Sequence, residues 1–199
     1  SYYSEKQRQA DCNFNAQALR PYLPAETALS GLFETASKLY GIKIEESKLP
    51  VWAPGVRSYS VQDANGAHLG SFYVDLYSRE GKQGSAWMSE LITSRSSGGT
   101  HEPNLGVLAA GFSPPADGNP ALLSHDDVCN LSHEFGHIMH QMLSDVEIKR
   151  FAGTNVSTDF LELPSQLMTE WAWNRQGIAL MSGHYQTGEK IPDELLDGL

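Results

Sequence analysis

The segment NLSHEFGHIMHQML, residues 130–143, constrains this chain more than any other part of its sequence. Its apolar residues recur every three or four positions, a spacing that predicts an amphipathic helix. At 100° per residue these apolar side chains gather on one side, whereas His133, His137 and His140 fall within about 60° of one another on the other side. The helix therefore carries a row of histidines that packing alone does not require.

The sequence also predicts where this helix begins. Ser124 is a favourable N-cap residue, and Asp127 follows it three positions later. Asp126 adds negative charge at the positive end of the helix dipole. The sequence therefore predicts a helix that begins at Ser124 and runs through the histidine-bearing segment.

The spacing of two of the histidines suits a metal ion. His133 and His137 are four residues apart, so their imidazoles lie one helical turn apart and can reach a single ion. Glu134 is rotated too far to be an easy third ligand, but it can reach a water molecule on that ion. This is the H-E-x-x-H pattern of zinc peptidases, in which the metal acidifies water and the glutamate takes the proton. A solvated histidine face is the alternative explanation.

A catalytic zinc ion needs a third protein ligand. His140 is seven residues from His133, about 10 Å along the helix, so a polar supporting role is expected for it. Glu162 lies between two leucines, where an unpaired buried carboxylate would be costly, and this makes it the candidate ligand. Asp159 is the rival, and both residues also fit as charges or caps at a helix N-terminus.

The N-terminal half of the chain shows first the helical period and then the period of two that is typical of strands. Residues 25–40 keep a helical spacing between Pro24 and Gly41, which predicts a helix. From residue 42 to about 87 the period becomes two, and RSYSVQD and HLGSFYVDLYSRE flank an ANG turn, which predicts a hairpin.

The second half continues with a loop, a strand and helices. Residues 93–104 are rich in Gly and Ser and predict a loop, and LGVLAAGF predicts a further strand. A last helix is predicted over residues 160–183, started or kinked by Pro164. Its expected buried side consists of Leu163, Leu167, Met168 and Trp171.

Composition limits the class of protein. A chain of 199 residues with 40% hydrophobic residues can bury one core, so residues 1–199 are expected to belong to a single domain. The net charge of -10 argues against nucleic acid and anionic membranes as partners. No apolar run reaches the roughly 18 residues that a membrane span needs. Cys12 and Cys129 are expected to be free thiols, which suits a cytoplasmic or organellar location.

Several motifs together point to a family. HEFGHIMHQ, GTNVSTDFLELPSQLMTEWAW and MSGHYQTGEKIPDELL follow one another, with GSFYVDLYSREGK and LLSHDDV upstream. Over most of its length the chain resembles the thimet oligopeptidase family of zinc metallopeptidases, peptidase family M3. The resemblance implies that His133, His137 and Glu162 bind one Zn²⁺ ion and that Glu134 is the general base.

The resemblance also carries expectations about fold and activity. It implies an α+β, mostly helical, zincin-type (gluzincin-like) catalytic core, with a small antiparallel sheet and an HExxH helix. It further implies hydrolysis of short unstructured peptides, without nucleic acid or membrane partners. An edge in GSFYVDLY is a further hypothesis for a strand that pairs with the substrate backbone.

Family members have longer chains than this one. The opening SYYSEKQRQA and the closing DELLDGL both look like parts of helices, so we expect the chain to be truncated at both ends and to partner with the missing parts of its own full-length chain. A Tyr- and His-bearing loop that stabilises the transition state in the family is not found, and His184 and Tyr185 stand in a different context. The alternative is a non-catalytic zinc-binding fragment or a degenerate relative.

Overall fold

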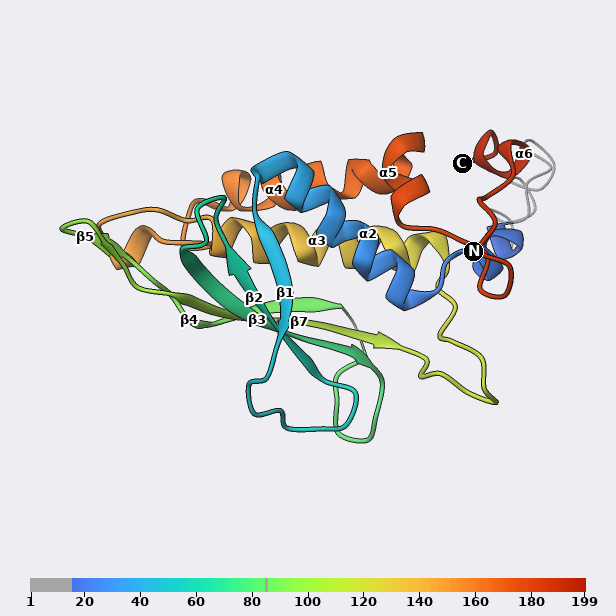
Figure 1. The fold of residues 1–199 in the computed structure, drawn as a ribbon, viewed down its shortest axis with the longest axis horizontal. Coiled ribbons are helices and arrows are strands. Elements are labelled where there is room, and N and C mark those ends of the chain that lie inside the picture. The colour runs from blue at the N-terminus through green and yellow to red at the C-terminus, as the bar shows by residue number, and fades with distance from the viewer. Residues whose placement is uncertain (1–15, 85) are drawn as a thin grey trace.

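A five-stranded sheet covered by helices on one face forms the fold of this chain (Figure 1). The structure is a computed structural model that describes residues 16–84 and 86–199. The strands of the sheet, in spatial order, are β1 (Lys43–Ser47), β2 (Arg57–Gln62), β3 (His68–Tyr77), β7 (Asn104–Phe112) and β4 (Trp87–Ile92). The helices are η1 (Ala16–Tyr22), α2 (Ala25–Tyr40), α3 (His125–Met142), η2 (Lys149–Phe151), α4 (Thr158–Trp173), α5 (Arg175–Leu180) and α6 (Asp193–Leu196).

The sheet is mixed. The predicted hairpin is confirmed by the antiparallel pairing of β2 and β3, and β7 is the predicted further strand. However, β3 and β7 run parallel, so the expectation of an antiparallel sheet is wrong for this central pair. Parallel neighbours need a crossover connection, and here the chain forms β4 before it returns as β7. Local alternation of side chains does not reveal such a crossover.

The free edges of the sheet belong to β1 and β4. β3 pairs with β2 on one side and with β7 on the other, and most of its residues are buried. The hypothesis that GSFYVDLY offers an edge to a substrate is therefore wrong, because its backbone groups are already used. The predicted loop over residues 93–104 also contains a small hairpin, formed by β5 (Ser96–Ser97) and β6 (Thr100–His101).

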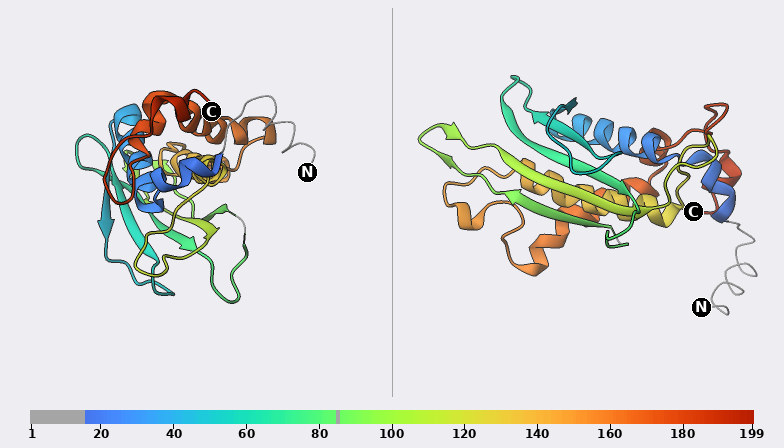
Figure 2. Two further views of the ribbon diagram at one scale, coloured as in Figure 1. Left: turned by 90° about the vertical axis from the view of Figure 1, so that its right-hand side faces the viewer. Right: turned by 90° about the horizontal axis from the view of Figure 1, so that it is seen from below.

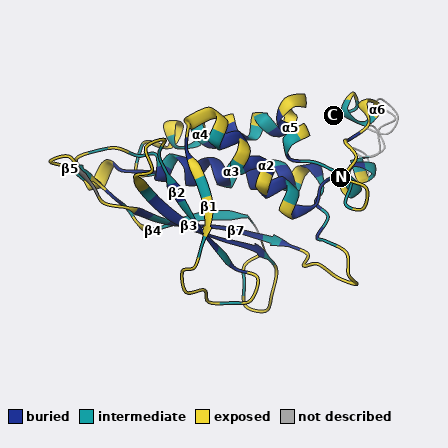
Figure 3. Ribbon diagram, viewed as in Figure 1, coloured by how far each residue is buried: buried dark blue, intermediate teal, exposed yellow. Residues whose placement is uncertain are grey.

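The helix α3 lies at the centre of the helical layer. Its core-facing residues are all at most 1% exposed: Val128, Leu131, Phe135, Ile138, Met139 and Met142. Seen from below, α2 and α4 flank α3 on its two sides (Figure 2), and α3 and α2 contact the sheet whereas α4 packs on α3 and α5. Buried residues run along α3 and the central strands (Figure 3). Phe33 of α2 contacts both Phe72 of β3 and Phe135 of α3, so one aromatic cluster joins the layers.

The start of α3 follows the prediction from sequence. The Ser124 side chain accepts a hydrogen bond from the Asp127 amide, and the Asp127 carboxylate accepts one from the Ser124 amide. This capping box satisfies two amides that a helix end leaves unpaired. It fixes the residue at which the histidine-bearing helix begins.

The last predicted helix is divided in two. α4 ends at Trp173, and the Asn174 side chain accepts hydrogen bonds from the first amides of α5. Pro164 lies inside α4, and Met168 is buried as expected. Leu163 and Leu167 are wrongly predicted as buried, because they are 47% and 57% exposed. The buried residues of α4 are instead Ser165, Met168 and Ala172.

Some expectations concern other parts of the chain. Cys129 is a free cysteine, whereas Cys12 and the proposed N-terminal helix lie outside the described residues. The closing DELL segment forms α6. Within residues 16–84 and 86–199, no helix combines the length and apolar character needed to cross a membrane.

Candidate metal centre

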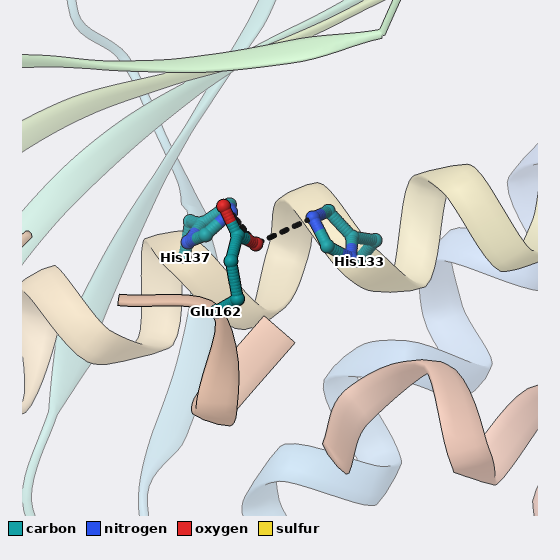
Figure 4. A group of neighbouring side chains, drawn as sticks. All are labelled: His133, His137 and Glu162. Atoms are coloured by element: carbon teal, nitrogen blue, oxygen red, sulfur yellow. Dashed lines mark ion pairs between the residues drawn. The ribbon is translucent and has the colours of Figure 1, made fainter. Parts of the chain in front are cut away.

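Two histidines of α3 and one glutamate of α4 converge on a single point (Figure 4). The Nε2 atoms of His133 and His137 lie 3.1 and 3.3 Å from the same oxygen, Oε2 of Glu162. The two imidazole rings stand almost perpendicular, with centroids 4.9 Å apart. One ligand atom from each residue lies within 4.8 Å of the other two.

A glycine of α3 lets α4 come this close. An added Cβ on Gly136 would lie 2.5 Å from Cα of Ser165 and 2.8 Å from the Pro164 carbonyl oxygen. No real Cβ makes such contacts, so only glycine permits backbone-to-backbone packing at this point. Pro164 and Ser165 are the residues of α4 that meet α3 at this point, and Leu163 and Leu167 are exposed. Glu162 therefore reaches the histidines because Gly136 lacks a side chain.

The burial of the three side chains differs. The side chain of His137 is 10% exposed and that of His133 is 26% exposed. Glu162 is 44% exposed, so the expectation that its carboxylate is buried is wrong. A hydrogen bond from Ser165 is the main cause that lowers the pKa of Glu162, and the histidines add to it. Burial lowers the pKa of His137, which favours the neutral imidazole that metals bind.

Glu134 lies beside His133 and Glu162 but is not one of the three converging residues. Burial raises the pKa of its carboxyl, although the neighbouring His133 and a hydrogen bond from the Met88 amide oppose that rise. Glu134 lines a cavity of about 290 Å³ together with Asp127, Asn130, the end of β7 and the segment just before β4. Glu134 is thus next to the converging ligands without belonging to them.

The donor set fits a zinc ion. Three electronegative atoms converge, and both imidazole nitrogens can be acceptors in one tautomer, so a cation between them would satisfy all three. Two imidazoles and one carboxylate are a common protein ligand set of catalytic zinc, with a fourth position left for water or substrate. The Nδ1 atom of His137 is buried without a hydrogen-bond partner among the described residues.

The residues considered as rivals lie elsewhere. The ring of His140 packs against Phe160, with centroids 6.0 Å apart. Asp159 is exposed at the start of α4, and a hydrogen bond from Ser157 lowers the pKa of its carboxyl. His184 accepts hydrogen bonds at Nδ1 from two amides of its own loop. Among the described residues, none of these three belongs to the converging group.

Two residues at the site were not anticipated from the sequence. Gly136 controls how closely the helices pack, and Ser165 donates a hydrogen bond to Oε2 of Glu162 at 2.9 Å. Each of these residues leaves only a weak indication in the sequence. A glycine inside a helix is unfavourable without a packing reason, and residues three apart on a helix share a face.

Comparison with known proteins places this chain in a family. The family model described as Peptidase family M3 matches residues 1–199. The chain therefore belongs to peptidase family M3, a family of zincin-like metallopeptidases, as its motifs predicted.

The relatives are peptidases by name. The chain is 44% identical to oligopeptidase A of Escherichia coli (strain K12), across 99% of this chain and 29% of that protein. It is 39% identical to dipeptidyl carboxypeptidase of the same strain, across 98% of this chain and 29% of that protein. A third relative is the organellar oligopeptidase A, chloroplastic/mitochondrial, of Arabidopsis thaliana, 36% identical across 98% of this chain and 26% of that protein. The chain thus spans less than a third of the length of these curated relatives.

Proposed function

We propose that this chain is the zinc-holding part of an oligopeptidase that hydrolyses short, unstructured peptides. The observation that carries the proposal is the convergence of His133 Nε2, His137 Nε2 and Glu162 Oε2 beside the carboxylate of Glu134. Membership of peptidase family M3 and relatives named as oligopeptidases support the same reaction. The location we propose is cytoplasmic or organellar.

The residues divide into two roles. His133, His137 and Glu162 hold one zinc ion, which when bound polarises the scissile carbonyl and acidifies a water molecule. Glu134 is the general base, and a carboxylate oxygen of Glu134 accepts the proton from the attacking water. Its partly buried position raises its proton affinity, which helps a carboxylate to act as base near neutral pH.

The free edge of β4 offers a place for the peptide backbone. The Met88 amide is directed to Glu134, so the outer edge of β4 faces the site. An extended peptide that pairs with this edge is held through its main chain, and its side chains then matter less. This assignment replaces β3 with β4 as the strand that receives the substrate.

The competing function is zinc binding without catalysis. The two functions are separated by incubating the zinc-loaded chain with a quenched fluorescent peptide. Hydrolysis that disappears when zinc is removed and returns when it is restored supports the peptidase. We expect the isolated chain to be weakly active or inactive, so the assay is repeated with a version extended to the length of its relatives. No hydrolysis by that longer version at full zinc occupancy supports a protein that only binds metal.

Zinc content is the primary test. After dialysis we expect about one zinc ion per folded chain. His137→Ala should lose most of that zinc and Glu162→Gln should weaken binding, whereas His184→Ala, a histidine outside the site, should bind normally. Because imidazole must be neutral to bind zinc, the affinity should fall as the pH drops through the lowered pKa of His137. A folded wild-type chain with almost no zinc would contradict the proposal.

A further inference from the structure

The hydroxyl of Ser165 lies directly behind the carboxylate that faces the histidines. Ser165 is 0% exposed, and its Oγ lies 2.9 Å from Oε2 of Glu162 and 2.9 Å from the carbonyl oxygen of the same residue. A hydroxyl has one proton, so it donates to one of these oxygens at a time. The carboxylate oxygen carries the larger charge and makes the stronger hydrogen bond.

Ser165 contacts the same carboxylate oxygen of Glu162 that lies between the two histidines. Oε2 of Glu162 is the atom nearest to the Nε2 atoms of both His133 and His137. Glu162 is 44% exposed, and an exposed glutamate samples several rotamers unless a contact fixes it. The Ser165 hydrogen bond is made in the rotamer that points to the histidines.

Ser165 itself is held in place from two sides. Its Cα lies only 2.5 Å from the position that a Cβ of Gly136 would take, so the backbones of α3 and α4 are in direct contact at this residue. The Thr169 hydroxyl donates to the Ser165 carbonyl oxygen at 3.0 Å, one turn further along α4. The hydroxyl is therefore attached to a rigid part of the molecule, as a group that orients a ligand must be.

We propose that Ser165 is a positioning residue that orients Glu162 for zinc binding. This inference rests on the proposed function, because it takes Glu162 as a zinc ligand. Partners that orient metal ligands are worth about 10- to 100-fold in metal affinity. Ser165 acts through Glu162 and does not touch the substrate or the metal.

The chain offers a matched control in Ser132. This serine is also 0% exposed and also sits on a helix, and its hydroxyl donates to the Val128 carbonyl oxygen four residues earlier. Its hydroxyl also lies 4.0 Å from the Met181 sulfur, and the hydrogen bonds of the described residues include none from it to His137 or Glu162. Ser132→Ala and Ser165→Ala thus remove the same atom from similar surroundings, and only the second removes a bond to a carboxylate.

The experiment measures the zinc dissociation constant of the 199-residue chain by competition with a chelating dye. Ser165→Ala should bind zinc about 10- to 100-fold more weakly, whereas Ser132→Ala should stay within about threefold of wild type. Thermal unfolding of the zinc-free variants should give similar stabilities, since each loses one buried hydrogen bond.

A double variant shows whether Ser165 acts through Glu162. In a Glu162→Ala background the carboxylate is absent, so Ser165→Ala should cause no further loss of affinity. The inference is overturned if Ser165→Ala binds zinc like wild type, if Ser132→Ala loses as much, or if the losses add in the double variant. A wild-type chain that binds no zinc would instead overturn the proposed function on which the inference depends.

Discussion

Two clusters of charged and polar side chains lie on opposite faces of the sheet, and they are built differently. On the outer face, Asp75 accepts hydrogen bonds from Arg79 at 2.7 and 2.8 Å, from Lys82 at 2.7 Å and from Trp52 at 3.0 Å. Both carboxylate oxygens are matched by donors, and two of the donors are cations. On the helical face, the three converging atoms of the candidate metal centre include no such cationic side chain.

The difference separates a structural cluster from the cluster that we propose binds zinc. The Lys82 side chain is only 5% exposed, and its ammonium also donates to the carbonyl oxygens of Asp75, Tyr77 and Ala110. This closed network ties the loop after β3 to the sheet. A buried charge is tolerated when it is fully paired. The three atoms of the candidate metal centre can all be acceptors when both Nε2 atoms are unprotonated, and a cation would then satisfy them.

Replacing a carboxylate by an amide should therefore have different effects beside the metal centre and in the outer cluster. Glu134→Gln keeps the size of the side chain but removes its ability to accept a proton. In the active enzyme we expect turnover to fall by about 10² to 10⁴, the typical contribution of a general base. The measurement is kcat on a quenched fluorescent peptide, with zinc content determined on the same sample and expected to be unchanged.

Asp126→Asn is the matched control for this prediction. Asp126 is an exposed carboxylate in the first turn of the same helix, so its loss should leave turnover nearly unchanged. If Glu134→Gln kept normal turnover at full zinc occupancy, another group would have to be the base.

In the outer cluster the equivalent change is Asp75→Asn, and it should affect stability. It leaves the Lys82 ammonium buried without its counter-charge, and breaking a buried ion pair in this way costs about 3 to 5 kcal/mol. Urea unfolding of the zinc-free chain measures the loss, and the zinc affinity of the folded variant should stay the same. Glu46→Gln, on the exposed edge strand β1, is the control and should change little. A stability equal to wild type would contradict the structural role of Asp75.

The sequence could predict the parts of both clusters that depend on local spacing. His133 and His137 share a face because they are four residues apart, and the cap at Ser124 needs only Asp127 three residues later. The approach of Glu162 depends on a contact between Gly136 and Ser165, which are far apart in the chain. The parallel pairing of β3 with β7 likewise depends on a crossover. Periodicity alone does not say which residues meet across such distances.

The next prediction concerns the contact between α3 and α4 at Gly136, which belongs to the metal centre and has no counterpart in the outer cluster. Gly136→Ala puts a Cβ 2.5 Å from Cα of Ser165, and the backbone of α4 must move to accommodate it. We expect a loss of about 1 to 3 kcal/mol in stability, as for other overpacked cores. Zinc affinity should fall as well, because Glu162 moves with α4. Gly84→Ala, where an added Cβ meets nothing within 4 Å, is the control. Unchanged zinc affinity would mean that the helix spacing does not position Glu162.

The outer cluster should also lose part of its contribution to stability as the pH falls. Burial raises the pKa of Asp75, but the hydrogen bonds from Arg79, Lys82 and Trp52 outweigh it and bring the pKa to about 2. In the unfolded chain the value is 3.8. The depressed pKa stabilises the fold above about pH 4, and this contribution of about 2 kcal/mol is lost as the pH falls toward 2.

Unfolding free energies at pH 5, 4 and 3 test this in wild type and Asp75→Asn. The difference between the two proteins should shrink as the pH falls, because protonated Asp75 resembles the amide. A difference that stays constant over this range would show that Asp75 keeps an ordinary pKa.

The smallest expected effect is at the start of α3, and it tests whether the metal centre depends on the end of its helix. Ser124→Ala removes the hydroxyl that accepts from the Asp127 amide, and loss of an N-cap costs about 1 kcal/mol. His133 lies nine residues further on, about 13 Å along the helix, and the core stripe of α3 holds that region independently of the cap. Urea unfolding should therefore show the loss, while dye competition shows wild-type zinc affinity. Ser144→Ala, just beyond the other end of α3, is the comparison, since its hydroxyl accepts from the Gly153 amide instead of from the helix. If Ser124→Ala weakened zinc binding as much as Gly136→Ala does, the histidines would depend on the whole helix, and the close packing of α3 on α4 would not be the feature that sets the site.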